Sequence, residues 1–202
     1  MTPDYILFPD ASAIPENDDR DFTYRGGYAC VILNPKNGNF TVVHKPSKKG
    51  NSYHLEIKAV KYGLQELCKV HTGYPLKVLV ISDCLAVVTT MNHLITYKGS
   101  KRRRWLTKRG NRIKFSEEYK KIYRIIKQYH LHIRFVHILS HGYNNNEINR
   151  SIQRKIRKNF RSHHIYSTTD LSSVFMQMNR IADLYAKSEL SKFQEKYRQS
   201  TS

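Results

Sequence analysis

Four acidic side chains stand in apolar, regularly patterned surroundings: Asp10, Glu56, Asp83 and Asp183. A charged group there is costly unless it is paired or binds a cation. Carboxylate oxygens are the ligands that Mg²⁺ and Mn²⁺ prefer, whereas thiol and imidazole clusters would indicate zinc. A pair of such ions suits phosphodiester hydrolysis, because it can activate water and stabilise both the transition state and the leaving oxygen. We therefore expect the four acids to converge on a divalent-metal site.

Each acid taken alone has a plainer explanation. Asp10 follows an apolar run and could cap the turn after a strand. Glu56 could be an exposed helical side chain beside Lys58 or Lys61. The metal-site hypothesis therefore depends on all four acids occurring together.

The elements that position these acids begin with a strand over Tyr5 to Ser12, which carries Asp10. A hairpin follows, with strands over 26–33 and 40–44 around a turn rich in Asn, Gly and Pro. Three antiparallel strands in a row place Asp10 in the middle of a sheet that grows from both sides of its strand.

A helix is predicted to begin at Ser52, because apolar residues recur at steps of three and four: Leu55, Ala59, Val60, Gly63, Leu64 and Leu67. Glu56 lies beside this stripe, where the helix meets the sheet. The nearly continuous apolar run from Leu76 to Ser82 is typical of a buried parallel strand, and it ends in Asp83. A right-handed strand–helix–strand unit makes the two strands parallel, so Asp10 and Asp83 should emerge at neighbouring carboxyl ends.

This ordered set of motifs resembles the ribonuclease H family over nearly the whole chain. The matching residues are Asp10-Ala11-Ser12, the pair Gly26-Gly27, Ser52 to Ala59 with Glu56, Ser82-Asp83, a strand over Ile133 to Leu139 followed by Ser140-His141-Gly142, and a closing helix with Asn179 and Asp183. The resemblance implies an α/β protein of the ribonuclease H-like fold, with a five-stranded mixed sheet and helices on both faces.

The resemblance also implies an activity, a metal-dependent endonuclease that hydrolyses the RNA strand of RNA/DNA hybrids with two Mg²⁺ or Mn²⁺ ions. In that scheme Asp10 bridges both ions, Glu56 and Asp83 complete the first, and Asp183 completes the second. His141 assists proton transfer or product release. The nucleic acid is contacted by Ser12 and Asn179.

The role of His141 stays open at this point. More than thirty residues separate it from Asp183, where the family has a short connection. His137, His163 and His164 are rivals, and His141 could instead be a turn residue after a strand.

The composition indicates a polyanionic partner. The 202 residues fit a single domain over 1–202, and 35 Lys and Arg against 16 Asp and Glu give a net charge of +19. A basic loop at 98–114 surrounds Trp105, the only tryptophan, with Lys101, Arg102, Arg103, Arg104, Lys108, Arg109, Arg112 and Lys114. Such cations neutralise phosphates, and an interleaved aromatic ring can stack on a base or sugar. A merely solvated basic loop is the alternative.

A second basic segment is a helical insertion at about 143–177. Ile148, Ile152, Ile156 and Phe160 recur at steps of four within 147–161, and basic residues cover the remaining faces. We expect this helix to contact the nucleic-acid backbone, or with equal weight to dock its isoleucines on the sheet or on a protein partner.

Several function classes are excluded or left as alternatives. No segment approaches the length of a membrane span, and the N-terminus lacks a signal-peptide pattern, so we expect a cytoplasmic monomer without a membrane partner. Three cysteines without metal-ligand spacing indicate reduced thiols. The alternatives within the fold are a DNA-directed transposase or junction resolvase and a non-catalytic nucleic-acid-binding module. Whether a polymerase or replication protein is a partner is left open.

Overall fold

The computed structural model describes residues 3–15, 24–71, 73, 75–138 and 171–200. Within these ranges the chain forms one mixed sheet of five strands in the order β3-β2-β1-β4-β5. The strands are β1 (Tyr5–Pro15), β2 (Tyr24–Leu33), β3 (Phe40–Ser47), β4 (Lys77–Ser82) and β5 (His132–His137). The strand β1 is central, antiparallel to β2 and parallel to β4, which confirms the predicted position of Asp10 in the middle of the sheet.

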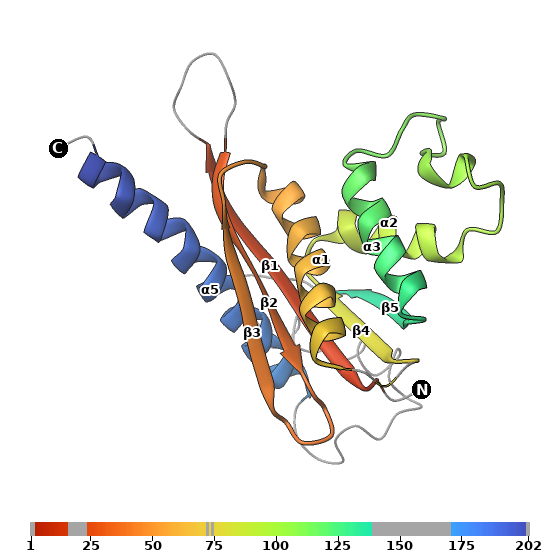
Figure 1. Cartoon of the computed structure of the whole chain (residues 1–202), viewed down its shortest axis with the longest axis horizontal. Coiled ribbons are helices and arrows are strands. Elements are labelled where there is room, and N and C mark those ends of the chain that lie inside the picture. The colour runs from red at the N-terminus through yellow and green to blue at the C-terminus, as the bar shows by residue number, and fades with distance from the viewer. Residues whose placement is uncertain (1–2, 16–23, 72, 74, 139–170, 201–202) are drawn as a thin grey trace.

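Helices cover both faces of this sheet, as predicted (Figure 1). One face carries α1 (Ser52–Val70), α2 (Leu85–Thr96) and α3 (Ser116–Gln128), and the other carries the long α5 (Leu171–Ser200). The closing helix therefore begins well before Asn179, so 171–177 belongs to α5 and not to a separate insertion. The rest of the predicted insertion, 143–170, lies outside the described residues. Among the described helices, none is long and apolar enough to cross a membrane.

Alternation along the strands divides the core into two layers. Leu7 of β1 packs with α1, α2 and α3, whereas its neighbours Ile6 and Phe8 pack with Phe175 on α5. Because both faces of β1 and β4 are buried, their sequences read as continuous apolar runs. A carboxylate in such a strand is buried on either face, so the burial of Asp10 requires a physical explanation.

The start of α1 is fixed by Asn51, whose side-chain oxygen accepts a hydrogen bond of 2.9 Å from the backbone N–H of His54. Asn is among the preferred residues for this role, because its side chain satisfies an N–H that the helix cannot. The helix then buries Leu55, Glu56 and Ile57 in succession against the sheet. Glu56 is therefore presented at the helix–sheet boundary, as the sequence predicted.

The long helix α5 lies very close to the sheet at Gly27 of β2. A Cβ atom there would lie 2.2 Å from the backbone oxygen of Ala186. Beside this contact, Glu189 accepts from His44 of β3 at 2.8 Å and pairs with Lys192. Glycine at position 27 thus lets α5 pack against β2, and these polar contacts hold the helix to the sheet.

The basic loop at 98–114 forms a compact protrusion between α2 and α3, with a short 3-10 helix at Arg103–Trp105. A narrow turn closes it, in which Leu106 pairs with Arg112 and Gly110 adopts φ +82°. The loop is thus an ordered structure. It ends at Phe115, a non-glycine residue with φ +57° that directly precedes α3.

Candidate metal-binding active site

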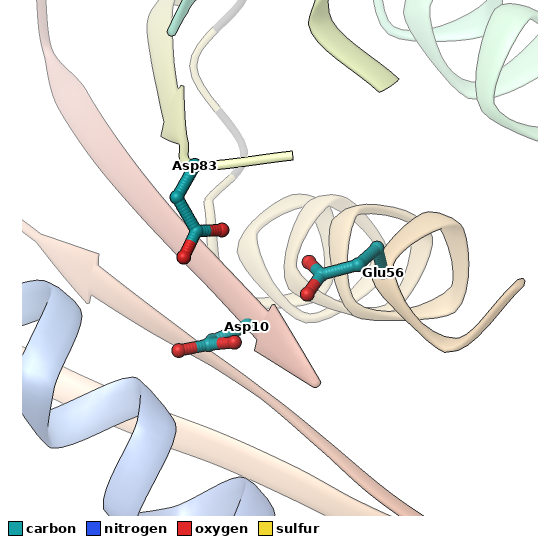
Figure 2. Close-up of side chains that lie close together, drawn as sticks. All are labelled: Asp10, Glu56 and Asp83. Carbon is teal, nitrogen blue, oxygen red and sulfur yellow. The ribbon is translucent and has the colours of Figure 1, made fainter. Parts of the chain in front are cut away.

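Three of the four predicted acids converge at one point. Ligand oxygens of Asp10, Glu56 and Asp83 all lie within 4.8 Å of one another. Figure 2 shows the three carboxylates pointing toward one another from β1, from α1 and from the end of β4. Glu56 is 46 positions after Asp10, and Asp83 is 27 positions after Glu56. The strand–helix–strand unit thus brings together residues that are far apart in sequence.

The register of the sheet explains this convergence. Leu7 of β1 is the last residue paired with β4, opposite Val80. Three residues further along each strand are Asp10 and Asp83, so both follow the point at which the two strands part. Asp10 shares the strand face of Phe8, on the side of α5, whereas Glu56 comes from α1 on the opposite side. The acids therefore meet through the opening between the two strands.

Burial and mutual repulsion dominate the electrostatics of the site. Asp10 and Glu56 are 4% and 6% exposed. Burial, followed by the like charge of Asp83, raises the pKa of Asp10 to about 7, against a smaller opposing effect of the Ala11 N–H that donates to it at 2.7 Å. Burial and the charges of Asp10 and Asp83 raise the pKa of Glu56 well above its ordinary value. Without a cation, these carboxyls favour protonation.

A divalent cation fits this donor set. One oxygen of Asp10 (Oδ2) and one of Glu56 (Oε2) are buried without a hydrogen-bond partner among the described residues. Leaving buried oxygens unsatisfied is costly, and a hard cation satisfies such oxygens directly. The sequence-based prediction of a metal site thus agrees with the geometry of Asp10, Glu56 and Asp83.

Asp183 lies near this group but is not part of it. Its charge contributes to the raised pKa of Asp10, so Asp183 is near enough to interact electrostatically with it. Its Oδ2, however, accepts from Lys187 one turn later, at 2.8 Å. The role of Asp183 as a fourth metal ligand stays a prediction.

Two further predicted residues are close to the acids in sequence. Asn179, one turn before Asp183, is 8% exposed, and its side-chain oxygen has no partner among the described residues. Ser12, two residues after Asp10, is half-buried on β1. The contacts of Ser12 and Asn179 with nucleic acid stay predictions.

Among the described residues, His137 is a histidine in contact with one of the three acids. Its Nε2 lies 2.9 Å from the backbone oxygen of Asp83, to which it donates when it carries the proton. On the other side of Asp83, the N–H of Cys84 donates to the hydroxyl of Ser82 at 3.1 Å. Sequence reasoning named His137 only as a rival of His141 and missed this contact. His141, His163 and His164 lie outside the described residues.

The basic residues of the protrusion divide into two groups. Arg104 donates to the backbone oxygen of Tyr97 and to the hydroxyl of Tyr123, and its guanidinium lies 4.8 Å from that ring. Trp105 is half-buried and meets Tyr123 edge-on at 5.9 Å, so both residues anchor the protrusion to α3. The others that the sequence analysis named are exposed: Lys101, Arg102, Arg103, Lys108, Arg109, Arg112 and Lys114, of which Arg112 pairs with Glu117.

Comparison with known proteins places this geometry in a known fold. No family model and no curated protein sequence matches the chain. The solution structure of the prototype foamy virus RNase H domain is similar, with a TM-score of 0.63 and 19% identity over 95% of this chain and 96% of that one. The chain has the ribonuclease H fold.

Two structures of the foamy viral protease–reverse transcriptase share this ribonuclease H fold. The foamy viral protease–reverse transcriptase in complex with RNA/DNA hybrid gives a TM-score of 0.60 and 15% identity over 93% of this chain. The match covers 20% of that protein, so this chain spans about a fifth of its length. Its complex with dsDNA gives a TM-score of 0.52 and 15% identity over 76% of this chain and 91% of that one.

Proposed function

We propose that this chain is a metal-dependent endonuclease that hydrolyses the RNA strand of RNA/DNA hybrids. The observation that carries the proposal is the convergence of Asp10, Glu56 and Asp83, with two buried oxygens that have no partner among the described residues and that a cation would satisfy. A protein that merely binds nucleic acid gains nothing from buried carboxylates, because they repel phosphate. The acids therefore favour a catalyst over a binding module.

The three carboxylates have distinct positions in the proposed reaction. Two Mg²⁺ or Mn²⁺ ions at this site would supply Lewis-acid stabilisation of the pentacovalent phosphate and a lowered pKa of the attacking water. Asp10 would hold both ions, and Glu56 and Asp83, whose ligand oxygens lie within 4.8 Å of those of Asp10, would complete the first ion. Asp183 would complete the opposite side once its carboxylate leaves Lys187. His141 keeps its predicted role in proton transfer or product release.

The proposed substrate follows from charge and from the fold. Exposed cations of the protrusion suit phosphates, which gives affinity but does not distinguish RNA from DNA. Selectivity would require contacts to 2′-hydroxyls of one strand, for which the polar side chains of Ser12 and Asn179 are suited. The RNA/DNA hybrid bound to a foamy viral relative of the same fold supports this choice.

A DNA-directed nuclease is the second candidate, because the same foamy viral protein is also known in complex with dsDNA. The test is to incubate the protein with Mg²⁺ or Mn²⁺ and matched RNA/DNA, RNA/RNA and DNA/DNA duplexes. Glu56→Gln should abolish cleavage, whereas Glu66→Gln, on the same helix but paired with Lys69, should retain it.

The outcomes separate the candidates. Cleavage of the hybrid alone, lost in Asp10→Asn, Glu56→Gln and Asp83→Asn, supports the proposal. Cleavage of DNA/DNA alone moves the assignment to the second candidate. Binding of all three duplexes without metal-dependent cleavage refutes the enzymatic function altogether.

A further inference from the structure

A buried tyrosine hydroxyl joins the three helices that cover one face of the sheet. Tyr119 of α3 is 0% exposed, and its hydroxyl lies 2.8 Å from that of Tyr53, in the first turn of α1. The same hydroxyl is hydrogen bonded to the side chain of Thr90 on α2. A buried hydroxyl without partners is costly, so these bonds fix its position. The hydroxyl of Tyr119 therefore connects α1, α2 and α3 at one point.

This point lies directly behind two of the metal-site acids. Tyr53 precedes Glu56 by three residues, so the two side chains are neighbours on the surface of α1. Asp83 directly precedes Cys84, the N-cap residue of α2. Burial and the bond to Tyr53 raise the pKa of the Tyr119 hydroxyl, and the charge of Cys84 adds to this effect, so Cys84 lies nearby. The hydroxyl thus connects the helix that carries Glu56 to the helix that begins after Asp83.

The spacing of these acids decides how well they can bind a cation. Ligand oxygens of Asp10, Glu56 and Asp83 lie within 4.8 Å of one another, where like charges repel. Mg²⁺ requires nearly ideal octahedral geometry, with oxygens at about 2.0–2.1 Å. A small movement of α1 away from α2 would therefore weaken metal binding, and the bonds of Tyr119 oppose that movement.

Other contacts of α3 are independent of this hydroxyl. Lys61 of α1 donates to Glu118 at 2.6 Å, which holds α1 and α3 together without Tyr119. Tyr123, one turn after Tyr119, accepts a hydrogen bond from Arg104 of the protrusion. The two tyrosines therefore have separate partners, and Tyr119 is the one directed toward the helices beside the acids.

We propose that Tyr119 is a positioning residue for the metal site. Through Tyr53 and Thr90, its hydroxyl holds α1 and α2 at the spacing that Glu56 and Asp83 need to bind a divalent cation. This inference rests on the proposed function and names a residue outside the acidic cluster that supports it.

The test is the affinity for Mg²⁺, measured by titration calorimetry on the full chain without nucleic acid. Tyr119→Phe removes the hydroxyl and keeps the buried ring. Loss of a group that orients a metal ligand costs about 10–100-fold in affinity, and Tyr119 acts one step further from the ion, so we expect about three- to tenfold. Tyr53→Phe should weaken binding in the same direction. The double variant should be no weaker than Tyr119→Phe, because both changes remove the same hydrogen bond.

The matched control breaks the neighbouring contact between the same two helices. Lys61→Gln with Glu118→Gln removes an ion pair without changing the net charge, and should leave the Mg²⁺ affinity within about twofold of wild type. Tyr123→Phe should weaken hybrid binding in EDTA, because Arg104 loses an acceptor, and should leave the Mg²⁺ affinity unchanged. Thermal melts check that every variant is folded.

Cleavage of the hybrid gives a second measurement. Tyr119→Phe should need about three- to tenfold more Mg²⁺ for its half-maximal rate, and the rate should recover at high Mg²⁺, because excess cation fills a weakened site. A loss of activity that Mg²⁺ does not restore would show a structural defect and contradict the positioning role.

The outcomes separate this inference from the proposed function. Wild-type Mg²⁺ affinity in Tyr119→Phe, or an equal loss in the Lys61/Glu118 control, overturns the positioning role alone. Mg²⁺ binding that depends on Tyr119, in a wild type that cleaves no duplex, supports the positioning role and refutes the proposed function. A wild type that binds no Mg²⁺ refutes both.

Discussion

Asp10→Asn should stabilise the metal-free protein while it abolishes cleavage. The carboxyl of Asp10 is buried beside Glu56 and Asp83, and its pKa is raised from 3.8 to about 7, chiefly by burial and secondly by the charge of Asp83. An acid whose folded-state pKa is raised contributes stability below its unfolded pKa, and this contribution is lost as pH rises through the folded pKa. The metal-free chain should therefore lose stability between about pH 4 and pH 7.

The magnitude follows from the size of this shift. Each pKa unit corresponds to about 1.4 kcal/mol, so the shift costs about 4 kcal/mol at pH 8, where the carboxyl is ionised in both states. At pH 5 the cost is about 2 kcal/mol, because the folded carboxyl is still protonated while the unfolded one is largely ionised. An uncharged amide removes the cost at both pH values, and its N–H groups can donate to the oxygens of Glu56.

The assay is urea unfolding with EDTA at pH 5 and pH 8. We expect Asp10→Asn to be more stable than wild type at both, by about 2 kcal/mol more at pH 8 than at pH 5. Glu66→Gln, which removes an exposed ion pair with Lys69, should differ from wild type by less than about 1 kcal/mol at either pH. Saturating Mg²⁺ should raise the stability of wild type more than that of Asp10→Asn. A variant no more stable than wild type at pH 8 would refute the reasoning.

Three further predictions concern the support of the site. His137→Leu should weaken Mg²⁺ binding about tenfold in titration calorimetry, because it removes the contact that holds the backbone of Asp83. His137→Gln should restore part of the affinity, because its side-chain N–H can donate to the same backbone oxygen. Gly27→Ala should lower the free energy of unfolding by about 1–3 kcal/mol, because the methyl group collides with a backbone oxygen of α5; unchanged urea midpoints would contradict this. Arg104→Ala should destabilise the fold by about 1–3 kcal/mol, whereas Arg103→Ala should leave thermal stability unchanged and lower only the salt slope of hybrid binding.

The convergence of the acids could be predicted because it depends on local and topological rules. The apolar run before Asp83 indicated a parallel strand, and the right-handed crossover then required its carboxyl end to lie beside that of β1. Glu56 was predictable from its place beside the apolar stripe of α1. These steps need only periodicity and connectivity, which a single sequence contains.

The remaining details depend on contacts between distant segments, which a single sequence does not reveal. The contact of His137 with the backbone of Asp83 requires the alignment of β5 with β4. The sequence could not show that Arg104 and Trp105 pack inward on Tyr123, because a run of basic residues does not reveal which of its side chains point toward the protein and which toward solvent. The ion pair between Asp183 and Lys187 is local to α5. The sequence alone, however, does not show whether Asp183 prefers this ion pair or a metal ion.

The order of the acids along the chain has a consequence for how the site assembles during synthesis. Asp10 lies on β1, Glu56 on α1 and Asp83 at the end of β4, and α5 follows all three elements along the chain. These three acids can therefore come together while α5 is still emerging from the ribosome. A cation captured at that stage would neutralise the clustered carboxylates early and ease the docking of the nascent chain into its final layers.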